Sequence, residues 1–575
     1  MRYLVLCCDY DGTLARHGRV RDETFDALDR LIASGRRVVL VTGRELDDLR
    51  RTCPRLEAFE YVVAENGALL YHPASRTVLP LAGPPPDAFV RALRERGVDP
   101  LSVGRSIVAT CEPWEATVLD VIRALGLEMQ VIFNKGAVMV LPAGVNKATG
   151  LQQALARMGL SPRNAAGIGD AENDHAFLSL CECSAAVANA LPSLRDEVDL
   201  VTAGEDGSGV EELIEALLRD DLASLEPRLG RHHILLGTDA DGKEVRIAPY
   251  GENVLLVGIS GSGKSTLATG MLERLAGHGY TFCVIDPEGD YDTFSGAVCL
   301  GTPARPPSAE EAVQLLGKPD ASAVLNLVGV PIADRPTFFI GLLSRLQELR
   351  SRTGRPHWIV MDEAHHLLPS QWQPVELTLP EKLQSVLQIT VHPGLMARHA
   401  LEDVDVLLTV GAQPSGMIEE FARVCSRPMP EIAPVTLEPG EALLWRTRGT
   451  RGTDPPVRLR VAPSRTERRR HTRKYAEGEL GPDRSFYFKG PQGKLNLRAH
   501  NLVTFMQLAD GVDDETWLHH LHSGDYSRWV RDCIKDEGVA AKIRAVENDA
   551  GMSAADSRRL IRAAIEEQYT LPASE

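Results

Sequence analysis

The sequence predicts an α/β protein with two successive α/β domains and a mainly α-helical carboxyl-terminal module. Short apolar runs, such as "YLVLCC" at 3–8 and "RRVVLV" at 36–41, are followed by polar turns and amphipathic stretches, a pattern typical of parallel sheets covered by helices. This alternation extends from residue 2 to about 220 and begins again at 233. Beyond residue 475 the apolar residues recur at helical spacing instead, as in "ETWLHHLHSGDYSRWVRDCIKD" at 515–536.

The composition is that of a soluble globular protein, with 43% hydrophobic and 25% charged residues. No apolar run approaches the ~20 residues needed to span a bilayer, and the amino-terminal run lacks the cleavage signal of a secretory peptide. The ten cysteines include no C-x-x-C pair. We therefore expect a cytoplasmic protein with reduced thiols and no membrane partner. The net charge of −16 argues against coating of nucleic acid by the whole chain but leaves a local basic groove open.

Changes in the pattern along the chain predict the domain boundaries. Within the first domain, "MQVIFNKGAVMVLP" at 129–142 predicts a β-hairpin that belongs to an inserted unit. The predicted parts are a first domain at 1–220 with an inserted α+β cap at about 84–143, a linker at 221–232, a second domain at 233–463, and a basic segment followed by the helical module at 464–575.

Two carboxylates follow the first apolar run, where "CDYDGTL" places Asp9 and Asp11 one residue apart. In open α/β sheets, ligands bind at the carboxyl ends of the strands. Repulsion between two neighbouring carboxylates has a use there, because one can stay ionised as a nucleophile and metal ligand while the other has a raised pKa and can donate a proton. The pair therefore predicts a catalytic site rather than a plain turn.

Three later segments add groups that suit a phosphate site. "LVTGR" places Thr42 at a strand end, where its hydroxyl can hold a phosphoryl oxygen. "GVNKATGL" places Lys147 at a helix start, a cation facing an anion. "GIGDAEND" ends a third strand in Asp170 and Asp174, oxygen ligands suited to Mg²⁺.

These four motifs, in this order, resemble those of the haloacid dehalogenase (HAD) phosphatases, in particular the Cof-like subclass with a type IIB cap. The resemblance implies a Rossmannoid core and a phosphomonoesterase that acts on a small sugar or metabolite phosphate. It implies that Asp9 forms an aspartyl-phosphate and that Asp11 protonates the leaving oxygen and later activates water. Thr42 and Lys147 would hold the phosphoryl group. The implied Mg²⁺ ligands are Asp9, Asp11, Asp170 and Asp174.

A second phosphate motif, "GISGSGKS" at 258–265, fits G-x-x-x-x-G-K-[ST] between the strand "NVLLVG" and a helix. Backbone N–H groups of such a loop cradle phosphates, while the lysine reaches the β- and γ-oxygens and the serine binds Mg²⁺. The motif predicts ATP binding. The residues expected to contact the nucleotide or its Mg²⁺ are Gly258, Gly261, Gly263, Lys264, Ser265 and Thr266.

The strand "HWIVMDEAHHLLP" ends in Asp362, which suits the Mg²⁺ shell, and Glu363, which suits a base that positions water. A water-positioning carboxylate favours ATP hydrolysis over transfer to another acceptor. His365 and His366 are expected to pack at a helix start, because the sequence shows no third metal ligand beside them.

Together with "VIDPEGDY" at 284–291 and "ITVHPGLM" at 389–396, these motifs resemble those of the HerA/FtsK group of P-loop motors. The resemblance implies a RecA-like domain, with Thr390 as a sensor of the γ-phosphate and Asp286 and Glu288 at a neighbouring strand end. It also implies a homo-oligomer, hexameric in many members, in which an arginine of the next subunit completes the site. Four arginines are open candidates: Arg398, Arg423, Arg446 and Arg448. The distance from the P-loop to Asp362 is short, and no basic insertion for gripping DNA is evident.

The carboxyl-terminal stretch "RSFYFKGPQGKLNLRAHN" at 484–501 mixes aromatic and basic residues. Such a mixture can bind a nucleic-acid strand, but the core of a helical module with a basic rim is the favoured interpretation. His519, His520 and His522 are expected on a solvated helix face rather than around a metal.

Three functions fit these motifs. The favoured one is a small-molecule phosphatase that an ATP-hydrolysing domain regulates or assembles, with nucleotide state changing the phosphatase rate in a homo-oligomer. The alternative is a nucleic-acid end-processing or translocating ATPase with phosphatase activity on phosphorylated ends. A nucleotide-dependent scaffold is the third. The cap favours the first, because a covered site suits a substrate small enough to be enclosed.

Overall fold

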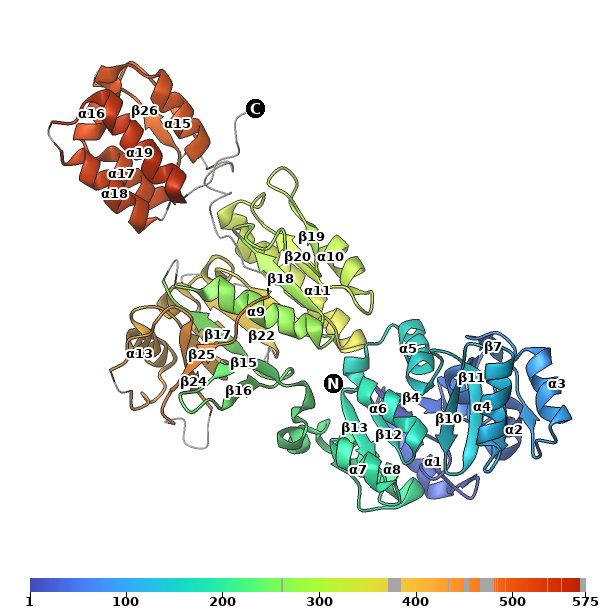
Figure 1. Ribbon diagram of the computed structural model, residues 1–575. Coiled ribbons are helices and arrows are strands. Elements are labelled where there is room, and N and C mark those ends of the chain that lie inside the picture. The colour runs from blue at the N-terminus through green and yellow to red at the C-terminus, as the bar shows by residue number, and fades with distance from the viewer. Residues whose placement is uncertain are drawn as a thin grey trace. The chain divides into compact units, whose positions relative to one another are not determined.

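The computed structural model describes residues 1–259, 262–370, 384–432, 434–448, 454–465, 480, 482, 484–491, 493–534, 536–549 and 551–568 (Figure 1). Its contacts divide the chain into two compact units, Met1–Ser464 and Arg465–Glu575. Across the described parts, no helix is both long and apolar enough to cross a membrane.

The first sheet has eight strands, and the six from β14 to β5 are parallel. Their residues are buried almost throughout, because helices cover both faces. The strand order is β14 (Leu200–Val201), β13 (Cys183–Ala186), β12 (Ala165–Gly169), β1 (Val5–Cys8), β4 (Arg37–Val41), β5 (Tyr61–Ala64), β6 (Leu69–His72) and β7 (Thr77–Pro80). The helices are α1 (Asp22–Ala33), α2 (Leu46–Thr52), α5 (Lys147–Met158), α6 (His175–Leu180), α7 (Pro192–Glu197) and α8 (Asp206–Asp220), with a small hairpin of β2 (Ala15–Arg16) and β3 (Arg19–Val20).

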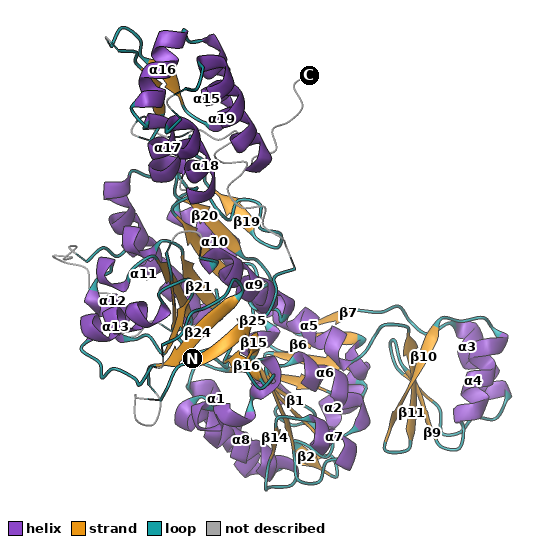
Figure 2. Cartoon of the chain, turned by 60° about the vertical axis from the view of Figure 1, so that its left-hand side comes forward, coloured by secondary structure: helices purple, strands orange, loops and turns teal. Residues whose placement is uncertain are grey.

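A separate four-stranded antiparallel sheet, with two helices on one face, forms the cap (Figure 2). Its own core includes Phe89 and Val118 from the helices and Val138 and Val140 from the sheet. The hairpin expected at 129–142 is present as β10 and β11. The cap elements are α3 (Asp87–Glu95), β8 (Ser102–Val103), β9 (Val108–Cys111), α4 (Glu115–Ala124), β10 (Met129–Asn134) and β11 (Ala137–Pro142).

The second sheet has eleven strands, of which the seven from β23 to β19 are parallel. Alternate residues of β17 enter opposite cores, Val254 and Leu256 on one face and Leu255 and Val257 on the other. The strand order is β16 (Glu244–Ile247), β15 (Ile234–Thr238), β25 (Val457–Val461), β24 (Glu441–Arg446), β23 (Val406–Thr409), β17 (Val254–Val257), β22 (Val386–Thr390), β21 (Trp358–Met361), β18 (Phe282–Asp286), β20 (Ala323–Asn326) and β19 (Val298–Leu300). The helices are α9 (Lys264–Gly277), α10 (Ala309–Leu316), α11 (Arg335–Thr353), α12 (Arg398–Glu402) and α13 (Pro414–Cys425).

Within the first unit, the two sheets meet through residues that precede their strands. Glu182, just before β13, is 3% exposed and accepts hydrogen bonds from Arg163 (3.1 Å) and from the hydroxyl of Tyr280 (2.7 Å), just before β18. Arg355, before β21, donates to the carbonyl of Gly159 at 2.6 Å. Residues 221–232, expected as a linker, include the short helices η5 (Ala223–Arg228) and η6 (Gly230–His232). Because these contacts are made at the amino ends of the parallel strands, the carboxyl ends of both sets of strands face away from this junction.

Acidification is expected to weaken this junction. Burial, together with Arg163, lowers the pKa of His232 to about 4, and the ring nitrogen Nε2 lies 2.5 Å from Nη1 of Arg163. The ordinary pKa of histidine is about 6.5, so the folded state favours the neutral ring. The stabilisation that the neutral ring gives to the folded state is fully present above that pH and is lost as the pH falls toward 4. The free energy of unfolding then decreases by about 1–2 kcal/mol, after allowance for the partial exposure of the ring.

Urea unfolding of the first unit, compared at pH 7.5 and pH 5, tests this prediction. His232→Gln can still accept a hydrogen bond from Arg163 but does not titrate, so it should lose less stability between these pH values than the wild type does. Equal losses in the two proteins would show that His232 does not control the junction.

The second unit combines a small hairpin with helices. The aromatic residues Phe486, Phe488, Phe505, Trp517 and Tyr526 all lie in its core. This placement supports the core interpretation of the aromatic stretch over exposed stacking platforms. Its elements are β26 (Phe486–Phe488), β27 (Leu497–Ala499), α15 (Leu502–Gly511), α16 (Asp514–His522), α17 (Asp525–Trp529), η10 (Val530–Ile534), α18 (Glu537–Glu547) and α19 (Ala554–Gln568).

Candidate functional site

The first site lies at the carboxyl ends of three adjacent strands. Asp9 follows β1, Thr42 follows β4 and Asp170 follows β12, and these strands are neighbours in the order β12, β1, β4. Lys147 is the first residue of α5, which Asn146 caps by accepting a hydrogen bond from the N–H of Thr149. Parallel pairing therefore brings together residues that are far apart in the sequence.

Lys147 lies between two carboxylates of this site. Its ammonium donates to Asp9 Oδ1 at 2.5 Å and to Asp174 Oδ1 at 2.6 Å, and all three side chains are buried. The second oxygen of Asp174 accepts from the backbone N–H groups of Asp170 (2.8 Å) and Ala171 (3.0 Å). A buried ion group of this kind keeps its charges only because each is paired and hydrogen-bonded.

The carboxylates outnumber the buried cation. Burial, and then the neighbouring Asp174, raise the pKa of Asp9 well above its ordinary value, although Lys147 opposes this shift. Burial alone would lower the pKa of Lys147, but Asp174 and Asp9 raise it. Ligand oxygens of Asp9, Asp170 and Asp174 lie within 4.8 Å of one another. Three clustered carboxylates with surplus negative charge fit a Mg²⁺ ion.

Asp11 lies outside this cluster. Arg44 holds both of its carboxylate oxygens, through Nε at 2.6 Å and Nη2 at 2.7 Å, and also binds Asp48 at 2.6 Å. The sequence interpretation placed Asp11 among the metal ligands, whereas the structure places it against Arg44. Thr42 is buried, and its hydroxyl accepts from the backbone N–H of Arg44 at 3.1 Å.

Arg44 and Lys135 are two site residues that sequence reasoning missed. Arg44 stands two residues after Thr42 in "LVTGR", so its proximity had a sequence signal. Lys135 comes from the cap hairpin, and its ammonium donates to Asp170. Asp170 also accepts from the hydroxyl of Thr13 at 3.0 Å. Only the docking of the cap brings Lys135 to this position.

The second site begins with the loop between β17 and α9. Gly258 has no room for a side chain, because a Cβ there would lie 2.6 Å from the carbonyl oxygen of Val410, and Gly263 has a φ of +102°. Lys264 is buried and donates to the carbonyl of Gly258 at 2.7 Å. In the first turn of α9, Ser265 is half-buried and Thr266 is exposed. Gly261 lies outside the described residues.

Strand β22 separates β17 from β21 and places Thr390 beside Val257. The carboxylates of Asp362 and Glu363 follow β21. Burial, and then Asp286, raise the pKa of Asp362 well above its ordinary value. Burial also raises the pKa of Glu363, to about 7, although Lys264 opposes this shift. Glu363 has a φ of 40°, a backbone conformation that non-glycine residues adopt at a cost.

His365 connects two residues of the second site. Its Nδ1 lies 3.2 Å from the hydroxyl of Thr390 and 3.5 Å from Glu363 Oε2, and its ring packs on His366 at 4.3 Å between centroids. In the part of the chain that the structure describes, neither histidine belongs to a cluster able to hold a metal. Asp286 stabilises the turn after β18. Its carboxylate accepts hydrogen bonds from the backbone N–H groups of Glu288, Gly289 and Tyr291.

The four candidate arginines lie in different places. Antiparallel pairing puts Arg446 opposite Val406, at the amino edge of the second sheet. Arg448 pairs with Asp403 at 2.8 Å. Arg423 is exposed in the last turn of α13, whereas Arg398 begins α12, after β22. Arg398 alone among the four follows the carboxyl end of a parallel strand closely.

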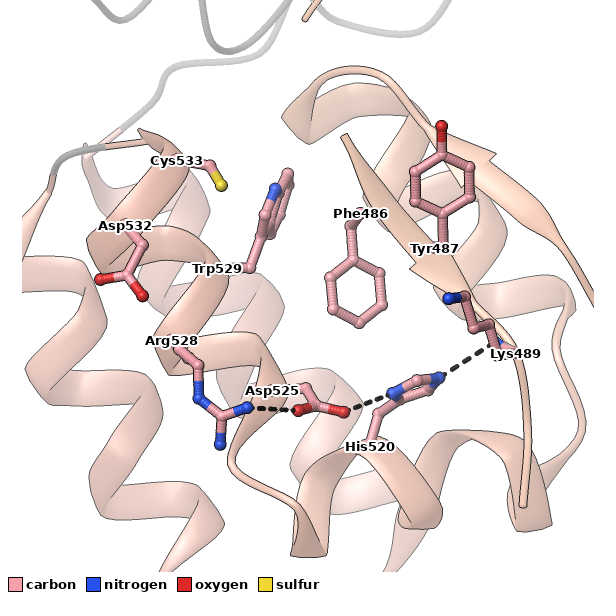
Figure 3. Close-up of a pocket in the computed structure, with 9 residues that line it drawn as sticks. All are labelled: Phe486, Tyr487, Lys489, His520, Asp525, Arg528, Trp529, Asp532 and Cys533. Carbon is pink, nitrogen blue, oxygen red and sulfur yellow. Dashed lines mark hydrogen bonds and ion pairs between the residues drawn. The ribbon is translucent and has the colours of Figure 1, made fainter. Parts of the chain in front are cut away.

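The second unit has a hollow of about 340 Å³ beside His520 (Figure 3). Both ring nitrogens of His520 are engaged, Nε2 with the backbone N–H of Lys489 (3.1 Å) and Nδ1 with Asp525 (2.7 Å). His520 is 5% exposed, so its placement on a solvated helix face was wrong. The expectation holds for His522, which is exposed, while His519 is half-buried.

With this geometry in view, comparison with known proteins identifies the amino-terminal region. The family model for haloacid dehalogenase-like hydrolases matches residues 6–85 and 115–214. A phosphoglycolate phosphatase of Halorubrum lacusprofundi is 33% identical over 208 residues, which are 34% of this chain and 90% of that protein. The chain belongs to the haloacid dehalogenase-like hydrolase family.

A second sequence relative agrees with this membership. A phosphoglycolate phosphatase of Natronomonas pharaonis is 33% identical over 226 residues, covering 37% of this hydrolase and 96% of that protein. A crystal structure of a haloacid dehalogenase-like hydrolase from Bacteroides thetaiotaomicron covers 37% of this chain and 99% of its own, with 19% identity and a TM-score of 0.33. The family model and the two phosphatase sequences confirm the family predicted from the four motifs, and with it the assignment to the hydrolases.

The family model for the central domain of helicase HerA matches residues 250–344 of this haloacid dehalogenase-like hydrolase. These residues include the P-loop, β18 and the start of α11. The resemblance of the second domain to HerA is thus confirmed as well.

Proposed function

We propose that the amino-terminal domain, residues 1–220, is a Mg²⁺-dependent phosphomonoesterase for small phosphate esters that carry a carboxylate, the class to which 2-phosphoglycolate belongs. The observation that carries this proposal is the buried group of Asp9, Lys147 and Asp174 beside Asp170. The names of the relatives support the choice of substrate class. The cap supports a small substrate.

In the first step, a carboxylate oxygen of Asp9 attacks phosphorus, and the bond from phosphorus to the alcohol oxygen breaks. Lys147 and Thr42 bind the phosphoryl oxygens. Asp11 gives a proton to the leaving oxygen, which requires its carboxyl group to turn from Arg44 toward the substrate. Bound Mg²⁺ would be held by Asp9, Asp170 and Asp174, and it supplies positive charge that offsets the repulsion between carboxylate and phosphate.

In the second step, water attacks the aspartyl-phosphate, and Asp11 removes a proton from that water. The bond between phosphorus and Asp9 breaks, and inorganic phosphate leaves. Asp11 thus acts as the general acid in the first step and as the general base in the second.

Phosphate release from a substrate panel tests the proposal. The purified full chain with Mg²⁺ should hydrolyse 2-phosphoglycolate faster than sugar phosphates, and a metal chelator should remove the activity. The panel includes an oligonucleotide with a 5′-phosphate. Hydrolysis of that substrate alone would favour nucleic-acid end processing and contradict the proposal, as would no hydrolysis at all.

We also propose that residues 233–463 form a RecA-like domain that binds and hydrolyses ATP. The conformations of Gly258 and Gly263 and the buried Lys264 support this proposal. So does the placement of Thr390, Asp362 and Glu363 at neighbouring strand ends. Lys264 would contact the phosphates, and Ser265 and Asp362 would hold Mg²⁺. Glu363 would position water. The helical module at 464–575 is proposed as a separate domain without an assigned activity.

We infer that this ATPase domain regulates the phosphatase within a homo-oligomer. The buried hydrogen bonds of Glu182 and Tyr280 support a rigid connection between the two domains. A non-hydrolysable ATP analogue is expected to change the phosphatase rate about 5- to 150-fold, the range of ordinary allosteric coupling. Phosphatase assays and sedimentation, with and without the analogue, measure both effects. A monomer whose phosphatase rate ignores the nucleotide would refute the inference.

A further inference from the structure

The cap hairpin carries a lysine at a position that disfavours it. Lys135 and Gly136 form the two-residue turn between β10 and β11, with φ values of 47° and 82°. Turns with positive φ at both central residues favour asparagine, aspartate and glycine. Non-glycine residues with such a backbone conformation are commonly found at functional sites. Lys135 is therefore a candidate functional residue.

That side chain reaches from the cap into the first site. The ammonium donates to Asp170 Oδ2, and it lies 2.9 Å from the place where a Cβ on Gly12 would stand. Gly12 has a φ of +81° and follows Asp11 directly. Lys135 thus covers the loop that carries both Asp9 and Asp11.

The two lysines of the site differ in their exposure and in the number of N–H donors that remain unused. The side chain of Lys147 is 1% exposed and binds two carboxylates, whereas that of Lys135 is 45% exposed. Among the described residues, Lys135 has one hydrogen-bond partner, Asp170. An ammonium has three N–H donors. Lys135 therefore retains donors and open space for an anionic group that enters the site.

The position of Lys135 is set by a docked cap. Glu65, a core residue that is 1% exposed, accepts from the backbone N–H groups of the cap residues Arg105 (3.1 Å), Ser106 (2.8 Å) and Ile107 (3.2 Å). Farther along the cap, Met139 contacts Asn66 at 3.2 Å. These contacts hold the hairpin over the site, so the contact of Lys135 belongs to a defined arrangement.

We propose that Lys135 binds the carboxylate of the substrate and thereby selects small phosphate esters with a carboxylate close to the phosphoryl group. This inference rests on the proposed phosphatase function. Lys147 and Thr42 serve the phosphoryl group, while Lys135 lies above the same loop with free donors. A substrate carboxylate can accept from the N–H donors that Asp170 does not use, whereas an ester without a carboxylate offers this ammonium no second partner. An ester without a carboxylate forfeits this additional charge-assisted hydrogen bond, so Lys135 favours substrates that carry a carboxylate.

The test compares two esters of equal length, 2-phosphoglycolate and ethyl phosphate, in the full-length wild type and in Lys135→Met. The variant should lose about 30- to 100-fold in kcat/KM for 2-phosphoglycolate, mainly through KM, and less than about threefold for ethyl phosphate. Lys135→Arg should restore part of the preference. Arg123→Met, which removes an exposed cation of the same cap, is the matched control and should change neither rate.

A second measurement does not depend on turnover. In the Asp9→Asn background, calorimetry should show that Lys135→Met weakens the binding of 2-phosphoglycolate by a similar factor. Equal losses for both esters, or no loss for either, would overturn the inference. If the wild type hydrolyses neither ester, the proposed phosphatase function fails, and the calorimetric comparison then decides the role of Lys135 by itself.

Discussion

Replacement of Asp9 by asparagine is expected to lower phosphatase activity by at least about a thousandfold, because the amide cannot form the aspartyl-phosphate. The variant should remain folded. Burial and Asp174 raise the pKa of Asp9, so removal of its charge relieves repulsion within the cluster. Phosphate release from 2-phosphoglycolate and thermal unfolding of the same preparation measure the two effects.

The matched control is Asp26→Asn, which makes the same change at an exposed position on α1. It should keep the wild-type rate. If Asp9→Asn retained a rate within about tenfold of the wild type, Asp9 would not be the nucleophile and the two-step mechanism would be wrong.

Replacement of Glu363 by glutamine is expected to lower ATP hydrolysis by roughly 100- to 1000-fold while ATP binding persists. The loop at 258–265 and Lys264 are unchanged in this variant, but the carboxylate proposed to position water is lost. Lys264→Ala should instead lose ATP binding, because the phosphates lose their buried cation. Binding of a fluorescent ATP analogue and release of phosphate from ATP separate these two outcomes.

The pH dependence of the wild type provides an independent check. Burial raises the pKa of Glu363 to about 7, so the fraction of ionised base, and with it the rate of ATP hydrolysis, should fall as the pH drops from 8 to 6. Glu419→Gln changes an exposed residue of α13 and should preserve both rate and pH profile. Normal ATP turnover in Glu363→Gln would place the base elsewhere.

Much of both sites was predictable from the chain. Asp9, Thr42 and Asp170 were expected at strand ends, and parallel pairing of β12, β1 and β4 brings them together. This kind of prediction succeeds because a strand, its turn and the next helix are contiguous, so local spacing carries the information. The placement of Thr390 beside the P-loop strand follows the same logic, although the sequence does not state that β22 lies between β17 and β21.

Other contacts of these side chains could not be predicted from residues that are neighbours in the sequence. The expectation for His520 failed because helical spacing alone does not say which side of a helix is covered, and in the structure Asp525 and the hairpin at Lys489 enclose the ring. The bidentate ion pair that Arg44 forms with Asp11 was not predicted either. Competition between alternative charged partners is settled only by their three-dimensional positions.

The sequence by itself determined the family, the two phosphate-binding motifs and the chemistry expected at each strand end, because these properties depend on residues that are neighbours in the chain. Only the tertiary structure decided that Lys135 of the cap meets Asp170 and that Glu182 and Tyr280 join the two sheets at their amino ends. Such contacts link residues 35 and 98 positions apart. They form only when separately folded elements dock against one another, and no local spacing encodes that event.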